Sequence, residues 1–201
     1  MTQADVLIIG GGLAGCAAAY YLARGGAAVL LVERGQLNGQ ASGQNAGSLH
    51  FQLEHRLIEH ADQAEQFAQV IPLNLLAIEE WSRLEEELDA FMDVTLHGGL
   101  MLAETEADLA LLRKKYALEK QWGLPTELLT AEEVRAIAPY LSDKVIAAGY
   151  CPREGHGNPR LVTPAFARGA QRHGAKIRTL TKVADIRRVN GRWSVALEGA
   201  E

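Results

Sequence analysis

The stretch that decides the fold is DVLIIGGGLAGCAAAYYLARGGAAVLLVER, residues 5–34. Its two runs of aliphatic and β-branched residues, 5–9 and 28–32, predict strands of a parallel sheet that is buried on both faces. Small and apolar residues at helical spacing between them predict a helix over 13–24, which a glycine pair ends. The stretch therefore predicts a β-α-β unit, whose crossover is expected to be right-handed.

The hexapeptide GGGLAG between the first strand and the helix fits the pattern G-x-G-x-x-G. In this pattern Gly10 permits a tight turn, Gly12 lets the backbone approach a pyrophosphate, and Gly15 lets helix and strand pack closely. Leu13 and Ala14 lie in the same turn, where free N–H groups at a helix N-terminus attract phosphate. We therefore expect these five residues to bind a dinucleotide. The alternative is a glycine-rich turn that holds no ligand.

An acidic residue, Glu33, ends the second strand 18 residues beyond Gly15. At this point a carboxylate can accept hydrogen bonds from an adenosine ribose, and it would repel a 2′-phosphate. The pattern thus disfavours an NADP-type ligand. It does not separate NAD from FAD, because both bring an ADP group to the same crevice.

The composition limits the other classes of protein. The chain has 201 residues, of which 48% are hydrophobic and 22% charged, so it is expected to form a packed core of between one and two domains at about 150 residues each. A net charge of −5 without a basic run argues against nucleic acid or an anionic membrane as a partner. Residues 6–23 carry no charge, but their glycines and the lack of a preceding Lys or Arg predict neither a membrane span nor a secretory signal. A cytoplasmic location follows as the expectation.

The rest of the chain alternates helical and strand patterns. Residues 35–48 are expected to form a loop, followed by two amphipathic helices, 53–70 and 73–88, that Pro72 separates. Five acidic residues of the second helix are expected to be a solvated face: Glu79, Glu80, Glu85, Glu86 and Glu87. Between residues 94 and 122 we expect strands within 94–103 with a turn or bulge at Gly98-Gly99, and a helix over 105–122. A capping box at 130–133 is expected to open a short helix, which a strand over 145–150 and a helix over 161–173 follow. The last predicted elements are strands over 176–181, 183–188 and 193–197, with a tight turn at Asn190-Gly191.

Several segments together resemble one known family. Residues 5–34, followed by ASGQNAG at 41–47, resemble the N-terminal half of the D-amino-acid-oxidase-like family of FAD-dependent oxidoreductases. This family includes glycine and sarcosine oxidases and the flavin subunits of amino-acid, proline and opine dehydrogenases. The later segments GGLMLAETEADLALL (98–112), TELLTAEEVRAIAPYL (126–141) and GYCPREGHGNPRLVTPAFARGAQRHGAKI (149–177) are similar to the same family. The resemblance covers essentially the whole chain.

The resemblance implies an α/β fold class, namely a Rossmann-like FAD-binding domain with an inserted, incomplete α+β substrate domain. Residues 1–90 and 151–201 would form the FAD-binding domain, and 91–150 part of the substrate domain. The loop after the second strand would contact the flavin through Ala41, Ser42, Gln44, Asn45, Ala46 and Gly47. The amides of Gln44 and Asn45 can hydrogen-bond flavin heteroatoms. An ordinary polar loop is the alternative.

Other residues receive a functional interpretation beside a structural one. The backbone of Val183 would pair with the adenine edge, or the side chain is merely core at a strand edge. Arg34 would line the adenosine pocket, or is a solvated charge. His50, the one catalytic candidate, follows the flavin loop and would face the ring or the substrate, the alternative being a structural role. His55 and His60 are expected to be surface residues, and no metal site is expected.

The resemblance implies an enzyme that oxidises a C–N bond of an amino acid or secondary amine by hydride transfer to FAD. Groups that cover the flavin and position the substrate come largely from the C-terminal half of the family. We therefore expect this chain to be the N-terminal portion of a longer flavoenzyme, either shortened or from an interrupted gene, that alone retains little FAD and is inactive. Alternatives are an NAD-binding dehydrogenase and a noncatalytic nucleotide-binding subunit completed by a partner chain. A homo-oligomer and a partner electron-transfer subunit both stay open, as does the electron acceptor.

Overall fold

The computed structural model describes residues 3–54 and 63–199, which belong to two compact units. The first unit contains residues 1–47, 85–93 and 157–201, and the second contains 48–84 and 94–156. As compact units, residues 48–84 thus group with 94–156. The FAD-binding and substrate domains expected from the sequence are defined by what they bind, and their ranges stay a prediction.

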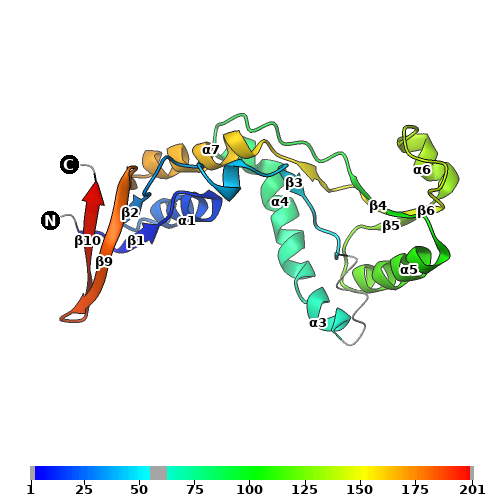
Figure 1. Cartoon of the computed structure of the whole chain (residues 1–201), viewed down its shortest axis with the longest axis horizontal. Coiled ribbons are helices and arrows are strands. Elements are labelled where there is room, and N and C mark those ends of the chain that lie inside the picture. The colour runs from blue at the N-terminus through cyan, green and yellow to red at the C-terminus, as the bar shows by residue number, and fades with distance from the viewer. Residues whose placement is uncertain (1–2, 55–62, 200–201) are drawn as a thin grey trace. The chain divides into compact units, whose positions relative to one another are not determined.

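The first unit is built on a three-stranded parallel sheet with the order β1-β2-β8. Its strands and helices are β1 (Val6–Ile9), α1 (Leu13–Arg24), β2 (Val29–Val32), the 3-10 turn η1 (Ala41–Gly43), α7 (Pro159–Arg172), β8 (Lys176–Arg178), β9 (Thr181–Val189) and β10 (Arg192–Gly199). The β-α-β unit predicted from residues 5–34 is present, with a parallel pairing of Val6 to Val29 through Ile9 to Val32 (Figure 1).

Burial differs between the two strands of this unit. All four residues of β2 are buried, because β1 and β8 flank it on its two edges. The expectation that β1 is buried on both faces is wrong for the described structure, in which β1 is half-buried and Ile9 is 55% exposed. The strand lies at the edge of the sheet, so β2 covers it on one edge only.

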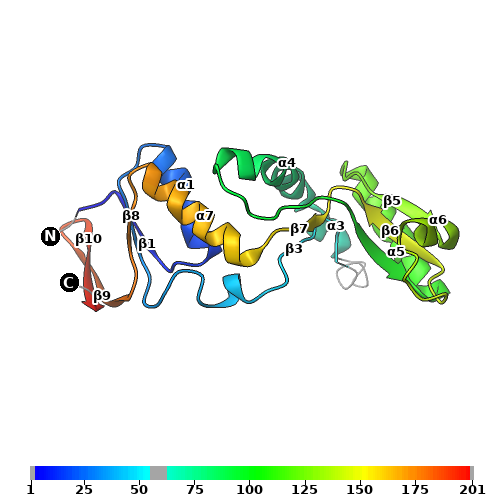
Figure 2. The ribbon, with the colours of Figure 1, turned by 90° about the horizontal axis from the view of Figure 1, so that it is seen from above.

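Helices α1 and α7 pack side by side in the first unit (Figure 2). Gly169 permits this approach, since a Cβ there would come within 2.9 Å of the Tyr20 ring. Tyr20 also meets Phe166 edge-on, with 5.8 Å between the ring centroids. Asn158 begins α7 as its N-cap and accepts the N–H of Arg160 at 3.0 Å. This packing holds α1, and with it the glycine-rich turn, against the rest of the first unit.

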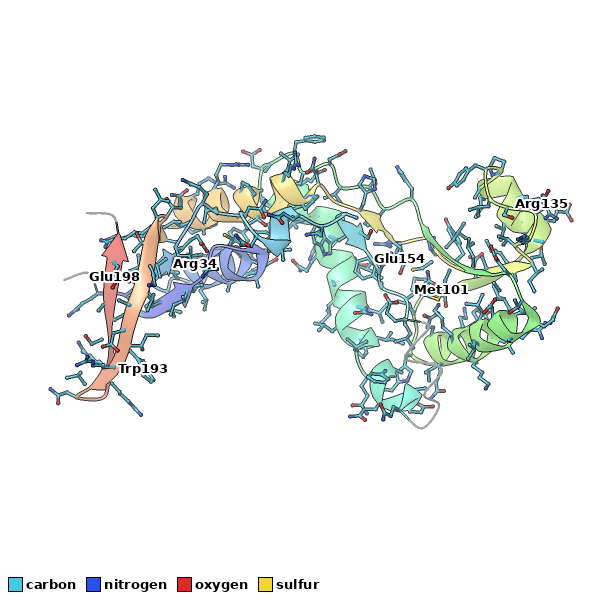
Figure 3. The ribbon with its side chains drawn as sticks, viewed as in Figure 1. Arg34, Met101, Arg135, Glu154, Trp193 and Glu198 are labelled. Atoms are coloured by element: carbon cyan, nitrogen blue, oxygen red, sulfur yellow. The ribbon has the colours of Figure 1, made fainter. Side chains whose placement is uncertain are left out.

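The antiparallel hairpin of β9 and β10 turns at Asn190 and Gly191, as predicted. Both residues have positive φ, 50° and 79°, which the favoured two-residue hairpin turn requires. One strand over 176–181 is not formed, because Leu180 adopts a φ of 51° and separates β8 from β9. Trp193 and Glu198 lie on β10 (Figure 3).

The second unit contains an antiparallel sheet with the order β4-β6-β5 and a two-stranded ribbon of β3 and β7. Its elements are β3 (Ser48–Leu49), α3 (Ala64–Ala68), α4 (Ile71–Glu87, which runs on into the first unit), β4 (Gly99–Ala103), α5 (Glu106–Gln121), β5 (Glu127–Thr130), α6 (Ala131–Ile137), β6 (Ala147–Cys151) and β7 (Gly155–His156). The capping box at Thr130 and Glu133 is confirmed, whereas β5 was not predicted. Gly98 has a φ of 103° directly before β4, where the turn is expected.

The predicted break between two helices is present, but it lies at Gln69 and Val70 and not at Pro72. Helix α4 begins at Ile71, so Pro72 lies in its first turn, where the missing N–H has no intrahelical partner to lose. Of the predicted helix over 53–70, the structure forms α3 at Ala64–Ala68, and residues 55–62 lie outside the described part.

The acidic run on α4 is more than the solvated face that its charge pattern predicts. Glu87 accepts a hydrogen bond from the hydroxyl of Tyr20 at 2.9 Å and pairs with Arg24, both on α1. Glu85 accepts the backbone N–H of Met92. These carboxylates fasten the end of α4 and the following turn within the first unit.

No helix within the described residues is long and apolar enough to cross a membrane. The same residues contain no group of three His, Cys, Asp or Glu side chains placed to hold a metal ion.

Candidate nucleotide-binding site

The glycine-rich turn joins the end of β1 to the start of α1 in the first unit. Gly10 has a φ of 111°, which L side chains rarely adopt, and its N–H donates to the carbonyl of Val32 at 2.8 Å. A Cβ at Gly15 would run into the carbonyl oxygen of Gly10. The roles predicted for these two glycines, a tight turn and close packing of helix on strand, agree with this geometry.

The first turn of α1 presents backbone N–H groups. Gly12 is the N-cap, and a Cβ there would lie 2.9 Å from the Ser42 hydroxyl oxygen. The hydroxyl of Ser42 accepts the N–H of Leu13 at 3.0 Å. Within the described residues no protein acceptor meets the N–H groups of Ala14 and Gly15. The helix N-terminus thus keeps two donors and its partial positive charge for an anion.

Glu33 lies directly beneath this turn. Its carboxylate accepts the N–H of Gly11 at 2.7 Å on one oxygen and the N–H of Gly35 at 2.7 Å on the other. These two hydrogen bonds, the first above all, hold the pKa of Glu33 below its ordinary value. A carboxylate has about four acceptor positions, so each oxygen keeps one for a hydroxyl group. The side chain is therefore charged, oriented and able to accept the two hydroxyls of a ribose.

The loop after β2 is tied to both sides of the site. The N–H of Asn38 donates to the carbonyl of Gly11 at 3.0 Å, and its side-chain amide donates to the carbonyl of Pro159 at 2.8 Å. A Cβ at Gly43 would run into the carbonyl oxygen of Asn38. These contacts bring Ser42 up to the N-terminus of α1.

Gln44 and Asn45 use their side chains within the loop. Asn45 donates to the carbonyls of Ala41 and Ser42 at 2.9 and 3.0 Å, and its amide oxygen accepts the N–H of Gly47 at 2.8 Å. Gln44 donates to the carbonyl of Gly39 at 3.0 Å. Both amides hold the shape of the loop, and the hydrogen bonds to a flavin that the sequence suggests for them stay a prediction.

The remaining predicted residues fall at different places. Arg34 is exposed beside Glu33 (Figure 3), and Ala41 and Ala46 are exposed in the loop. Val183 lies half-buried in β9 opposite Leu197, next to a bulge that breaks the register of the hairpin. Their contacts to a cofactor stay predictions.

His50 is exposed and belongs to the second unit, and a role in catalysis stays a prediction as well. His55 and His60 lie outside the described residues.

Three residues of the site were missed by the sequence interpretation. Gly11 and Gly35 donate the N–H groups that orient Glu33, and Asn38 joins the loop to the glycine turn and to α7. Gly11 has a signal in the sequence as the middle glycine of GGG, and a Cβ there would run into a terminal carbon of Leu37 and come within 3.0 Å of the Cβ of Glu33. Asn38 has none, because its partner Pro159 lies 121 residues away.

The residues present fit the ADP part of a dinucleotide. Two unpaired N–H groups at a helix N-terminus suit a pyrophosphate, a glycine without Cβ lets it approach, and an oriented carboxylate suits a ribose. The side-chain oxygen of Asn38 is buried without a hydrogen-bond partner in the same loop. The donor and acceptor set matches the predicted ligand class without a further side chain.

Known proteins are similar to this chain both in sequence and in fold. The anaerobic glycerol-3-phosphate dehydrogenase subunit A1 of Haloferax volcanii is 33% identical over 182 residues, which are 90% of this chain and 29% of that protein. The glycine oxidase of Bacillus licheniformis is 31% identical over 186 residues, or 90% and 47% of the two chains. The crystal structure of glycine oxidase from Geobacillus kaustophilus matches with a TM-score of 0.84 and 27% identity over 98% of this chain and 52% of that one. The chain thus spans less than half the length of these two sequence relatives.

The match to glycine oxidase confirms the mixed α/β fold, while the inserted substrate domain stays a prediction. The family model described as FAD dependent oxidoreductase, DAO, matches residues 5–201. FAD is the cofactor of this family, which agrees with the cofactor expected from the sequence. The chain belongs to the DAO family of FAD-dependent oxidoreductases.

Proposed function

We propose that this protein oxidises a C–N bond of an amino acid or a secondary amine by hydride transfer to FAD. The observation that carries the proposal is the glycine-rich turn of the first unit, which combines the free N–H groups of α1 with the oriented carboxylate of Glu33 in a member of an FAD-dependent family. The glycine oxidase relative supports an amino-acid substrate, since its name states that substrate for that protein.

Each part of FAD has a proposed place in the first unit. The pyrophosphate would accept the N–H groups of Ala14 and Gly15, and the adenosine ribose would donate to Glu33. The flavin would extend along the loop at 41–47, and the adenine would lie against the backbone at Val183. Arg34 is free to screen the adenosine from solvent, because its side chain is exposed beside Glu33.

Bound FAD supplies the two-electron acceptor for the reaction. Oxidation of the C–N bond removes a hydride from carbon and a proton from nitrogen, so the substrate leaves as an imine. The residues of the first unit would bind and orient the cofactor and take no part in that proton transfer.

A second candidate is the oxidation of a C–O bond in a phosphorylated alcohol. The relative from Haloferax volcanii favours it, because that protein is named a glycerol-3-phosphate dehydrogenase subunit and is 33% identical to this chain. The two candidates share the FAD site and differ in the bond that is oxidised, so a substrate test separates them.

The test uses protein purified from its native source, with a dye as electron acceptor. Glycine, sarcosine and proline are compared with glycerol 3-phosphate. Turnover of an amine substrate is expected, turnover of glycerol 3-phosphate alone supports the second candidate, and bound FAD without any turnover supports a noncatalytic subunit.

A second test measures the affinity for FAD. The variant Glu33→Ala is expected to bind FAD about tenfold more weakly because the ribose hydrogen bonds are lost, whereas Glu133→Ala on α6 serves as the control. Unchanged FAD affinity of Glu33→Ala would count against the assigned role.

A further inference from the structure

The two edges of the parallel sheet in the first unit differ in charge. β8 forms one edge with Lys176 and Arg178, and charged side chains are a common means of keeping an edge strand from pairing with another strand. β1 forms the other edge with the sequence VLII, which contains no charged residue and no proline. The preceding Asp5 turns its carboxylate to the β2 side, where it accepts the N–H of Ala28 at 2.8 Å. The edge at β1 is therefore open to a further strand.

The backbone groups of β1 alternate between its two sides. The N–H groups of Val6 and Gly10 donate to carbonyls on the β2 side, at 3.2 and 2.8 Å, so the even-numbered residues face β2. Successive residues of a strand in a parallel sheet turn their N–H and C=O groups to opposite sides. Leu7 and Ile9 therefore point these groups away from β2, and no strand of the described residues pairs with β1 on that side.

The side chains of β1 are also incompletely covered. Ile8 faces α1, since its side chain would lie 3.4 Å from a Cβ at Gly15. Leu7 and Ile9 alternate with Ile8 and so lie on the other face, where Ile9 is 55% exposed. Aliphatic strands of parallel sheets are normally covered on both faces. The exposure of Ile9 thus agrees with the open edge in indicating that β1 takes a further neighbour.

The order of the strands indicates which kind of neighbour fits this edge. Along the chain β1, β2 and β8 are the successive strands of the parallel sheet, and in space they stand in the order 3-2-1. In the common dinucleotide-binding order 3-2-1-4, a fourth parallel strand lies on the far side of the first, and the dinucleotide binds where the order reverses. A strand beside β1 would therefore flank the glycine turn that follows β1.

A protein of similar fold has chain to spare for such a strand. The glycine oxidase from Geobacillus kaustophilus matches 98% of this chain over 52% of its own length. Nearly half of that protein thus has no counterpart among these 201 residues.

We propose that β1 pairs, through the backbone of Leu7 and Ile9, with a parallel strand of aliphatic and β-branched residues from the part of the family fold that this chain does not span. Main-chain hydrogen bonds at Leu7 and Ile9 would hold the added strand, as in other cases where a segment extends a sheet at its edge. The added strand would also cover the exposed side chain of Ile9. This pairing does not depend on which bond the protein oxidises.

The test is photo-crosslinking of the protein in its native host, with the cross-linked peptides identified by mass spectrometry. The variant Ile9→p-benzoylphenylalanine is compared with Lys176→p-benzoylphenylalanine on the opposite edge of the same sheet. Position 9 is expected to cross-link to an aliphatic segment outside residues 1–201, which position 176 does not reach. Absence of a cross-link from position 9, or a cross-link to β1 of a second copy, would overturn the proposal.

Hydrogen exchange of the unaltered protein from its native source tests the backbone pairing. The amides of Leu7 and Ile9 are expected to exchange at least about tenfold more slowly than that of Gly191, which lies exposed in the hairpin turn. Exchange of both amides as fast as that of Gly191 would contradict the proposal, because both would then face solvent.

A charged variant tests whether the added strand depends on this edge. Ile9→Lys is expected to expel the strand and to speed the exchange of the Leu7 amide about tenfold. Ile186→Lys, at an isoleucine of the same unit that is 47% exposed, is the matched control and leaves this exchange unchanged. Amides of β2, which β8 holds on the other side, report that the sheet stays folded. Unchanged exchange of Leu7 in Ile9→Lys would contradict the proposal.

Discussion

Glu33 in the first unit and Glu154 in the second use the same device in different surroundings. Each carboxylate accepts two backbone N–H groups, from Gly11 and Gly35 in one case and from Phe51 and Gln52 in the other. Glu33 is half-buried, and its partners Gly35 and Gly11 lie 2 and 22 residues away in the sequence. Glu154 is 2% exposed and reaches residues more than 100 positions away.

The difference in burial indicates a different role for each of the two carboxylates. Where water and ligand can reach the group, as at Glu33, the backbone bonds orient it and acceptor positions are left for a hydroxyl. Where burial is almost complete, as at Glu154, a third donor from Gln52 occupies the other oxygen and the carboxylate serves the structure. We therefore expect changes at the first to act on binding and changes at the second to act on stability.

The largest effect is expected at the ion pair beside Glu154. Lys115 is 1% exposed and Glu119 is 0% exposed, so Lys115→Met leaves a buried carboxylate without its cation. The expected loss is about 3–5 kcal/mol in the free energy of unfolding, measured with urea. Lys115→Met/Glu119→Gln is expected to recover part of the loss, because glutamine still accepts the N–H of Leu53. A double variant as unstable as the single one would contradict this account.

Next in size is the direct comparison of the two carboxylates. Glu154→Ala leaves the buried N–H groups of Phe51 and Gln52 without acceptors and is expected to cost about 3 kcal/mol. Glu33→Ala is expected to cost about 1 kcal/mol or less, since solvent can reach its partners. Both losses are to be measured by urea unfolding of the free chain. A larger loss at Glu33 than at Glu154 would reverse the assignment of binding and structural roles.

A smaller effect is expected in the pH dependence of the stability. The N–H groups of Gly11 and Gly35 hold the pKa of Glu33 below its ordinary value of 4.5. A lowered pKa in the folded state adds stability above pH 4.5, and this contribution is lost as the pH falls through the folded pKa. Glu33→Gln should therefore show a shallower loss of stability than the unaltered chain between pH 5 and pH 3, measured by thermal unfolding. Identical slopes would mean that the carboxylate is not held as described.

The smallest effect uses one cysteine in each unit as a reporter. Burial raises the pKa of both Cys16 and Cys151 to about 11, and both thiols are fully buried, so neither should react with iodoacetamide at pH 8. Gly15→Ala, which strains the turn beside Cys16, should speed the labelling of Cys16 first. Glu154→Ala should speed that of Cys151 first.

Mass spectrometry after labelling measures the two rates separately. Equal acceleration of both cysteines in both variants would show that the two regions do not open independently, and the comparison between them would then fail.

The glycine turn and Glu33 could be predicted from the sequence because the pattern that reveals them is local, whereas Gly11, Gly35 and Asn38 were missed. Gly10, Gly12 and Gly15 fall in one hexapeptide, and Glu33 ends the next strand at the spacing that the β-α-β unit requires. The capping box at Thr130 and the turn at Asn190 were predictable for the same reason.

The second region could not be predicted, because its contacts depend on the tertiary fold. No local signal joins Glu154 to Phe51 or Lys115 to Gln52, and a buried lysine on α5 reads as a surface charge in the sequence. The contacts of the acidic run on α4 could not be predicted for the same reason. Tyr20 and Arg24, which bind Glu87, lie more than 60 residues away in the sequence. The place of Pro72 in the first turn of α4 could not be predicted either, because it depends on the residue at which the helix begins.

The most direct test of the central claim, an FAD site in the first unit, is the absorbance spectrum of the protein purified from its native source. The cofactor is released by denaturation and identified by chromatography. The account predicts flavin bands and the release of FAD. Colourless protein that binds NAD but not FAD would contradict it.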